Sequence, residues 1–308
     1  MLYFYFGKEQ LTMYVRRKSN WYIYFIAFGI TMAFVIMAIF AFKWYLFPED
    51  SQNTVNNKVT GELTDDFRPT AEHSLNLLGM VSEGVNDSPD FFYMAEYNAP
   101  ENSLTFVPLP NGISVGSEGR TLPNVYAAQG GMEVIKAVEN ETGIRCNVFV
   151  KMDRLSFEDL LTSFGNIEYD LQKTIVVTEG GEITTFNSGR HLLTSEEVYK
   201  LIIKANYDEG ESYRFKIAGE IFSELINQNY HNIDSGLLDT YFDIIMKNSE
   251  TNLTESVYKM HKAALLNTIT YGISPAEFYI PYGEYSDDGG FKIAENSIIS
   301  IKQKAGLS

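Results

Sequence analysis

The sequence is short of cysteine and of positive charge, and both shortages exclude whole classes of protein. Cys146 is the one cysteine in 308 residues, so neither a disulfide scaffold nor a cysteine-based zinc cluster is available. It lies in the apolar run 146–150, which we interpret as a buried strand with the thiol as a small core group rather than a reactive one. The four histidines are scattered without ligand spacing, so no zinc or iron site is predicted.

Basic residues number 24 against 40 acidic ones, which gives a formal net charge of −16. The first fifty residues hold five basic and three acidic side chains, so the rest of the chain carries 19 against 37, or −18. A field of that sign repels phosphate backbones, and we therefore exclude nucleic acid as a partner. No Gly-x-Ser-x-Gly segment is present, and the glycine-rich pieces at 116–119 and 289–290 fit no phosphate-binding loop.

One long apolar run predicts a membrane span. Residues 21–42 contain no charge and no proline, and as a helix they extend about 33 Å, enough to cross the hydrocarbon core. Arg16, Arg17 and Lys18 precede the run, so the positive-inside rule places the N-terminus in the cytoplasm and the C-terminal portion outside. A cleaved signal peptide is the alternative, but the run is longer than a signal core and no small-residue cleavage site follows it.

These signals predict a single-pass protein of the cell membrane, with the lipid bilayer as a partner. We expect a cytoplasmic segment at 1–20, a transmembrane helix at 21–42 and a polar juxtamembrane linker at 43–70. The remaining residues, 71–308, form one extracellular domain. Its short apolar runs predict strands at 75–78, 91–97, 104–107, 146–150, 167–171, 174–177 and 183–186.

Helical periodicity alternates with these strands. The predicted helices are 132–141, 156–164, 194–204, 213–227, 237–246 and 253–266. Ser156 with Asp159 and Thr194 with Glu197 have the spacing of capping boxes at two of the helix starts. Because strands and helices interleave, the sequence predicts an α/β domain in which a sheet carries helices on both faces.

Several fragments, in order along the chain, are similar to motifs of one known family. They are residues 77–79, 124–143, 157–167, 189–194 and 251–254, together with the strand–turn–strand that starts at Asp90. In this set the outer domain resembles the LytR–CpsA–Psr family of bacterial envelope proteins. The resemblance implies an αβα sandwich behind a single membrane anchor. It also implies a glycopolymer, carried on polyprenyl pyrophosphate, that is moved to peptidoglycan or another acceptor.

The resemblance further implies which residues form the site. In that family, a group of acidic residues with Mg²⁺ and several arginines binds the pyrophosphate. Here it assigns Asp90 as the catalytic and metal-holding carboxylate. The pyrophosphate contacts that it suggests are Arg214, Lys204, Lys216 and Arg120. The positions where the family motifs are degenerate are Ser88, Asn111, Gly112, Ile203, Ala205 and Ile217.

Four of those degenerate positions, Ser88, Asn111, Ile203 and Ile217, match arginines of the family. Loss of one charge-assisted contact costs about 1.5–3 kcal/mol, so four losses approach about 6 kcal/mol even at the low end. Lysine does not restore the forked geometry of a guanidinium. We therefore expect a membrane-anchored envelope protein with impaired catalysis that retains carrier or partner binding.

Purely structural roles are also possible for the same residues and for the aromatic ones. Asp90 is also a polar residue at a strand start, Arg214 a solvated cation beside Glu211, and Arg120 a loop cap. The aromatic residues Phe91, Phe92, Tyr93 and Phe106 either line a slot for a polyprenyl tail or fill an ordinary core. The alternative functions are an extracellular interaction or sensory module that keeps only the fold, and an active phosphotransferase.

Overall fold

The computed structural model describes residues 67–116, 119–286 and 290–306. The predicted cytoplasmic segment 1–20, transmembrane helix 21–42 and most of the linker 43–70 lie outside these residues. Within the described part, no helix combines the length and apolar character that crossing a membrane requires. The rest of this description concerns the domain that begins at residue 67.

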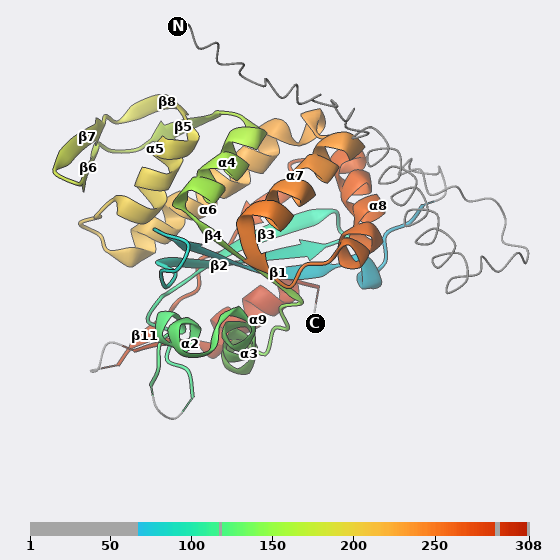
Figure 1. Ribbon diagram of the computed structural model, residues 1–308, viewed down its shortest axis with the longest axis horizontal. Helices are drawn as coiled ribbons and strands as arrows, with labels where there is room; N and C mark the ends of the chain where they lie inside the picture. The colour runs from blue at the N-terminus through green and yellow to red at the C-terminus, as the bar shows by residue number, and fades with distance from the viewer. Residues whose placement is uncertain (1–66, 117–118, 287–289, 307–308) are drawn as a thin grey trace, which may run out of the picture. The chain divides into compact units, whose positions relative to one another are not determined.

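A mixed sheet of six strands forms the centre of that domain (Figure 1). Its order is β10 (Ala276–Phe278), β3 (Ser103–Leu109), β2 (Phe91–Asn98), β1 (Leu75–Ser82), β4 (Val148–Asp153) and β9 (Ser249–Thr251). β1, β2 and β3 pair antiparallel, whereas β4 lies parallel to β1 and β10 parallel to β3. The parallel pair β1–β4 brings the carboxyl ends of two strands to the same edge of the sheet, which positions the site described below.

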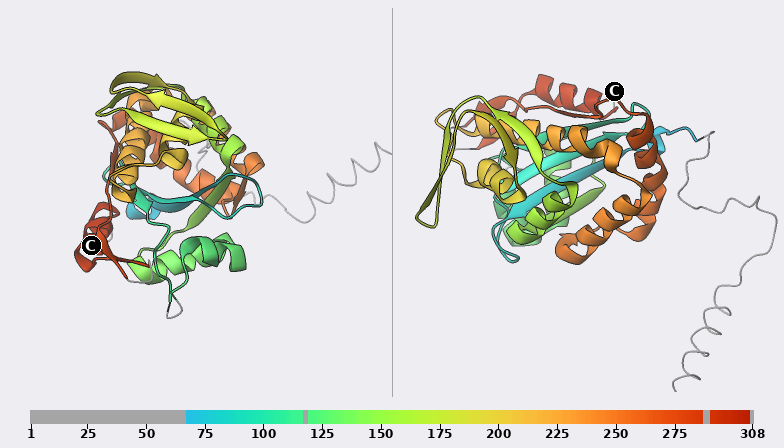
Figure 2. Two further views of the ribbon diagram at one scale, coloured as in Figure 1. Left: turned by 90° about the vertical axis from the view of Figure 1, so that its left-hand side faces the viewer. Right: turned by 90° about the horizontal axis from the view of Figure 1, so that it is seen from above.

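Helices cover both faces of the sheet, because its strands alternate apolar side chains between two cores (Figure 2). Phe92 and Met94 face one core, together with α2 (Leu122–Gln129), α3 (Gly131–Thr142) and α9 (Glu295–Lys304). Phe91 and Phe106 face the other, with α4 (Arg154–Phe164), α5 (Ser195–Tyr199), the π-helical turn η2 (Lys200–Lys204) and α6 (Glu211–Asn229). The predicted α/β class with helices on both faces is confirmed.

The remaining elements extend these layers. α7 (Ser235–Asn248) packs beside α4 and β9, and α8 (Glu255–Tyr271) packs beside α7 and the short helices η1 (Ala71–His73) and η3 (Tyr230–Asn232). Three two-stranded ribbons complete the described fold: β5 (Ile167–Leu171) with β8 (Gly189–Leu193), β6 (Ile175–Glu179) with β7 (Glu182–Phe186), and β11 (Gly283–Tyr285) with β12 (Phe291–Ile293).

Two local predictions are corrected by the structure. The capping box at Ser156 is wrong, because α4 begins at Arg154 and its cap is Asp153, whose carboxylate accepts a 2.8 Å hydrogen bond from the Ser156 amide. Cys146 is buried as predicted, but it precedes β4 instead of lying in it. The capping box of Thr194 and Glu197 is confirmed at the start of α5.

Candidate functional site

The candidate site lies where β1 and β4 end side by side. The last pair in their parallel register joins Ser82 to Asp153, so the residues that follow, Glu83 and Arg154, leave the sheet at the same edge. Polar groups at the carboxyl ends of parallel strands converge for this topological reason. Glu83 also opens the turn 83–90, which leads to Asp90 and β2. The buried Lys151 supports that turn, since its ammonium donates a 3.4 Å hydrogen bond to the carbonyl oxygen of Gly84.

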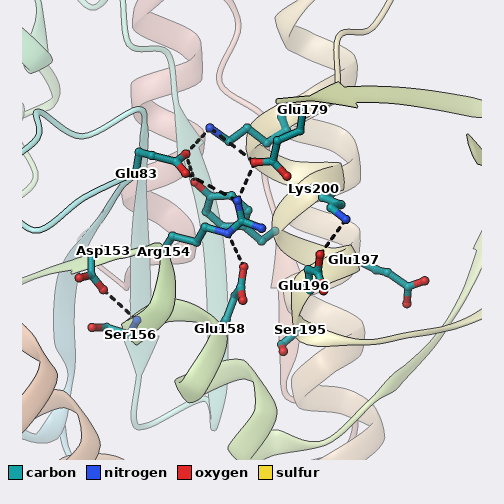
Figure 3. A network of polar contacts seen from close by, with 12 residues as sticks. Glu83, Asp153, Arg154, Ser156, Glu158, Glu179, Ser195, Glu196, Glu197 and Lys200 are labelled. Carbon is teal, nitrogen blue, oxygen red and sulfur yellow. Dashed lines mark hydrogen bonds and ion pairs between the residues drawn. The ribbon is translucent and has the colours of Figure 1, made fainter. Parts of the chain in front are cut away.

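Arg154 is the centre of a charge network at this edge (Figure 3). Its Nε donates to Glu158 at 2.8 Å, one turn along α4, and its NH1 donates to Glu179 at 2.6 Å, at the end of β6. Glu83 lies 3.6 Å from the same NH1 group. The guanidinium carbon lies 4.7 Å from the ring centroid of Tyr199, a cation–π distance. The guanidinium of Arg154 therefore interacts with three carboxylates and one aromatic ring.

Lys204, at the end of the π-helical turn η2, supplies the second cation of the network. Its ammonium forms an ion pair with Glu83 and lies 3.9 Å from Glu179. Glu83 in addition accepts a 2.9 Å hydrogen bond from the Tyr199 hydroxyl. The hydrogen bond from Lys204 is the main reason that the pKa of Glu83 lies below its usual value. Single π-helical turns are frequent at functional sites, and this one aims a lysine at the sheet edge.

Asp90 lies beside this network. Its amide donates to the carbonyl oxygen of Val81 at 2.8 Å, and its own carbonyl oxygen accepts a 2.6 Å hydrogen bond from the Asn111 side chain. Loss of water around its carboxyl group raises the pKa of Asp90, with a further contribution from the charge of Glu83, while Lys204 opposes the rise. The structure thus brings Asp90, Asn111 and Lys204 to the same edge of the sheet, and their roles stay predictions.

The charge balance of this cluster is negative. Glu83, Glu158, Glu179 and Asp90 give four carboxylates, against the two cations Arg154 and Lys204. Both cations are already engaged by the chain's own carboxylates. An incoming pyrophosphate would have to displace those carboxylates or approach an excess of negative charge.

The other predicted pyrophosphate contacts lie elsewhere. Arg214 donates to the main-chain carbonyl oxygen of Ala205 at 3.1 Å, and its buried Nε has no hydrogen-bond partner in the described structure. Arg214 is not paired with Glu211, whose carboxylate accepts a hydrogen bond from Tyr285 instead. Lys216 lies 3.7 Å from Glu220, in a groove between α6 and β5 whose lining does not include Asp90. Exposed Arg120 bridges to Val115 through its backbone.

The residues at the degenerate positions, where the family motifs are not kept, take part in core packing and backbone hydrogen bonds. Ile217 is fully buried, Ile203 packs against the same core, and Ala205 is buried, with its carbonyl oxygen accepting the hydrogen bond from Arg214. Gly112 accepts a 2.6 Å hydrogen bond from the Phe291 amide through its carbonyl oxygen, and Ser88 is half-buried in the turn 83–90. At none of these positions does a side chain supply a positive charge.

The residues do not fit a magnesium centre. In the described ranges, no group of three or more His, Cys, Asp or Glu side chains is arranged to hold a metal ion. Glu83 and Asp87 lie in the same turn as Asp90, and Glu83 is held by Lys204 and Tyr199. A single carboxylate is a poor site for Mg²⁺. Magnesium at Asp90 stays a prediction, and no chemical step is derived from it.

The aromatic residues named from the sequence form core contacts. Tyr93 and Phe106 pack against Phe222 of α6, with ring centroids 5.1 and 5.3 Å apart respectively, and Phe91 lies 6.3 Å from the same ring. Phe92 belongs to the core on the opposite face of the sheet. Phe222 therefore fills the space between these rings, as in an ordinary core.

Sequence reasoning missed most of the network. Glu83, Arg154, Glu158, Glu179 and Tyr199 were not among the candidate residues. The available signal was positional: Glu83 directly follows an apolar strand, and polar residues at such ends are placed by the sheet. Glu179 carried no such signal, because its approach depends on how the end of β6 packs beside η2 and meets the first residue of α4.

Comparisons with known proteins agree with the fold. The model of the LytR_cpsA_psr family matches residues 50–287. A putative transcription regulator from Eubacterium siraeum is 25% identical, covers 84% of this chain and 100% of its own, and has a TM-score of 0.74. TagV from B. subtilis is 16% identical, with 76% and 98% coverage and a TM-score of 0.61. TagT bound to LIIa-WTA is 18% identical, with 80% and 94% coverage and a TM-score of 0.57. Curated proteins gave no match.

Proposed function

The chain belongs to the LytR–CpsA–Psr family, and from that premise we propose that it takes part in glycopolymer attachment at the cell envelope as a pseudoenzyme. In this proposal catalysis is impaired and the binding of a carrier or partner is kept. We propose a glycopolymer as the ligand class, and the relative TagT has been solved bound to LIIa-WTA. The observation that carries the proposal is the neutralisation of Arg154 and Lys204 by Glu83 and Glu179.

The physical reason is the charge that phosphoryl transfer requires. Transfer from a pyrophosphate needs cations on the bridging and leaving oxygens, and guanidinium groups supply them best in a bidentate arrangement. Here Asn111 stands where the family motif has an arginine, and its uncharged side-chain amide donates to the carbonyl oxygen of Asp90. Arg214 donates to the carbonyl oxygen of Ala205. With the remaining cations paired to carboxylates, little electrostatic stabilisation is left for a developing negative charge.

Membrane anchoring completes the proposal. The apolar segment 21–42 would hold the outer domain at the bilayer, with the N-terminus in the cytoplasm. A polyprenyl carrier and peptidoglycan would then both be within reach of the domain. The packing of Phe222 against Tyr93 and Phe106 favours one alternative, an interaction module that keeps only the fold, because it closes the space considered for a lipid tail.

The experiment uses the full-length chain in detergent with a polyprenyl pyrophosphate and Mg²⁺. We expect phosphate release at the rate of the protein-free control, together with a ligand-induced rise in melting temperature. Asp90→Ala is compared with Asp87→Ala, an exposed carboxylate of the same turn, as the matched control. Release that is lost in Asp90→Ala alone would identify an active phosphotransferase. If neither phosphate release nor a rise in melting temperature is observed, the interaction module is the function that the result supports.

A further inference from the structure

A second concave region lies next to the candidate site. It is a cleft of about 420 Å³ between the end of β3, the start of α6 and the β11–β12 ribbon. Pro110, which lines it, directly precedes Asn111, the residue that contacts Asp90. Six of the residues lining this aromatic cleft have side chains that define its chemistry: Glu209, Glu211, Phe215, Tyr282, Tyr285 and Phe291.

The charge of the aromatic cleft has one sign. Among the described residues that line it, Glu209 and Glu211 carry carboxylates and none is a lysine, arginine or histidine. The positive end of α6 also lies here, but Glu211 in its first turn offsets that partial charge. Glu209 is already paired with Lys173 at the margin of the cleft, so Glu211 is the carboxylate that an external cation would meet.

Aromatic rings supply the rest of the lining. Tyr282 and Tyr285 are 53% and 59% exposed, which is unusual for rings of that size. Tyr285 lies edge-on to Phe291, with ring centroids 4.8 Å apart at an angle of 61°. The Tyr285 hydroxyl donates to Glu211 at 2.7 Å. Burial and the neighbouring Glu211 raise the pKa of Tyr285 to about 12, so the phenol keeps its proton and can donate this hydrogen bond at neutral pH.

The chain provides an internal precedent at the margin of this cleft. Lys173 forms an ion pair with Glu209, and its ammonium nitrogen lies 4.0 Å from the ring centroid of Tyr213. An alkylammonium group is thus already held between a carboxylate and a tyrosine face. The same combination of a carboxylate and exposed rings recurs inside the aromatic cleft, where none of the described lining residues provides the cation.

We propose that the aromatic cleft binds an alkylammonium group of an external ligand, held by the rings of Tyr282 and Tyr285 and by the carboxylate of Glu211. Aromatic rings attract such cations through their quadrupole, most strongly where water is excluded. The volume suits a head group with a short substituent. This inference does not depend on the proposed function, because it involves no phosphate and none of the residues of the charge network.

Isothermal titration of the full-length chain in non-ionic detergent tests the proposal. Choline is expected to bind with a dissociation constant of about 1 mM, and its neutral isostere 3,3-dimethylbutan-1-ol at least about tenfold more weakly. Tyr285→Ala should weaken choline binding about tenfold or more, and Tyr285→Phe, which keeps the ring, should stay within about threefold. Glu220→Gln, in the groove that contains Lys216, is the control that should change nothing.

Nα-acetyl-lysine amide, titrated in parallel, distinguishes a primary from a quaternary ammonium, and binding of either one supports the site. Equal affinity for choline and for its neutral isostere would contradict the proposal, because the cleft would then bind apolar groups only. Unchanged binding in Tyr285→Ala would contradict it as well. So would the absence of binding by both cations up to about 50 mM. Tyr285 is exposed, so we expect its variants to fold, and circular dichroism checks this.

Discussion

Raising the pH from 5 to 8 is expected to lower the free energy of unfolding by about 3 kcal/mol, through the titration of one buried carboxyl group. That group is Glu96 in β2. It is fully buried, and neither of its carboxyl oxygens has a hydrogen-bond partner in the described structure. Burial raises its pKa from 4.5 to about 8, and the charge of Lys304 in α9 opposes the rise only in part.

The sign follows from linkage. In the unfolded chain Glu96 loses its proton near pH 4.5, whereas in the folded chain it keeps the proton up to about pH 8. The folded state therefore binds more protons throughout this window, and its stability is full below pH 4.5 and is lost as the pH rises toward 8. Carboxylates with lowered pKa values, such as Glu83 and Asp239, act with the opposite sign but titrate below pH 4.5.

Urea denaturation of the full-length chain at pH 5, 6, 7 and 8 measures this dependence. Glu96→Gln should flatten it, because the amide carries no charge at any of these pH values. Glu101→Gln, an exposed residue just after β2, should keep the native slope. A native chain whose stability is constant or rises from pH 5 to 8 would mean that Glu96 is solvated or paired in solution.

Substitution of Gly79 is expected to produce an equally large effect. Gly79 lies in β1 opposite Tyr93 of β2, and the tyrosine ring crosses directly over it. A Cβ atom at Gly79 would lie 2.1 Å from Cζ of that ring, which no side-chain adjustment of the alanine can relieve. Tyr93 also packs against Phe91, Phe106 and Phe222, so moving it disturbs the whole aromatic core. We expect Gly79→Ala to cost about 3 kcal/mol of stability.

A double-mutant cycle separates this clash from a general effect of alanine. In a Tyr93→Leu background the ring is gone, and Gly79→Ala should then cost less than about 1 kcal/mol. Gly236→Ala, in the first turn of α7, meets only a carboxylate oxygen at 3.4 Å and should be neutral or slightly stabilising. Additive effects of the Gly79 and Tyr93 substitutions would show that the ring does not lie over the glycine.

The fold was predictable from the sequence to the extent that local patterns determine it. Alternating apolar runs identified β1, β2 and β3, and the spacing of Ile217, Ile221 and Leu225 identified α6. The helices α2 and α9 and the strands β8 to β12 were not predicted. The five strands are five residues or shorter, and β9 to β12 have three each, so their pairing depends on tertiary contacts instead of periodicity.

Only those residues of the candidate site that occupy a fixed position along a sequence motif could be predicted. Asp90 and Asn111 were identified by counting along the motif, and they do lie together, because β2 and β3 are antiparallel neighbours. Arg154 and Glu179 are 25 residues apart and meet at 2.6 Å through the packing of a helix start against a ribbon end. No periodicity encodes such an approach. Arg214 was chosen because it matches an arginine of the family motif, and in the structure its side chain donates to a backbone carbonyl oxygen.

In the proposed function, the loss of catalysis arises from carboxylates that pair with the remaining cations as well as from missing arginines. A member of this family that lacked arginines but kept free cations would still attract a pyrophosphate. Here Glu83 and Glu179 occupy Arg154 and Lys204, so removing those two carboxylates should uncover latent affinity for anions. The net charge of the cluster would change from −2 to zero, since four carboxylates against two cations become two against two.

The most direct test is therefore the affinity of inorganic pyrophosphate for the native chain and for the Glu83→Gln/Glu179→Gln double variant, measured by titration calorimetry at low salt. Glu196→Gln, which breaks the neighbouring Lys200 pair, serves as the control (Figure 3). We predict that the double variant binds pyrophosphate at least about tenfold more tightly than the native chain, and that the control does not. Tight binding by the native chain, or no gain in the double variant, would contradict the account.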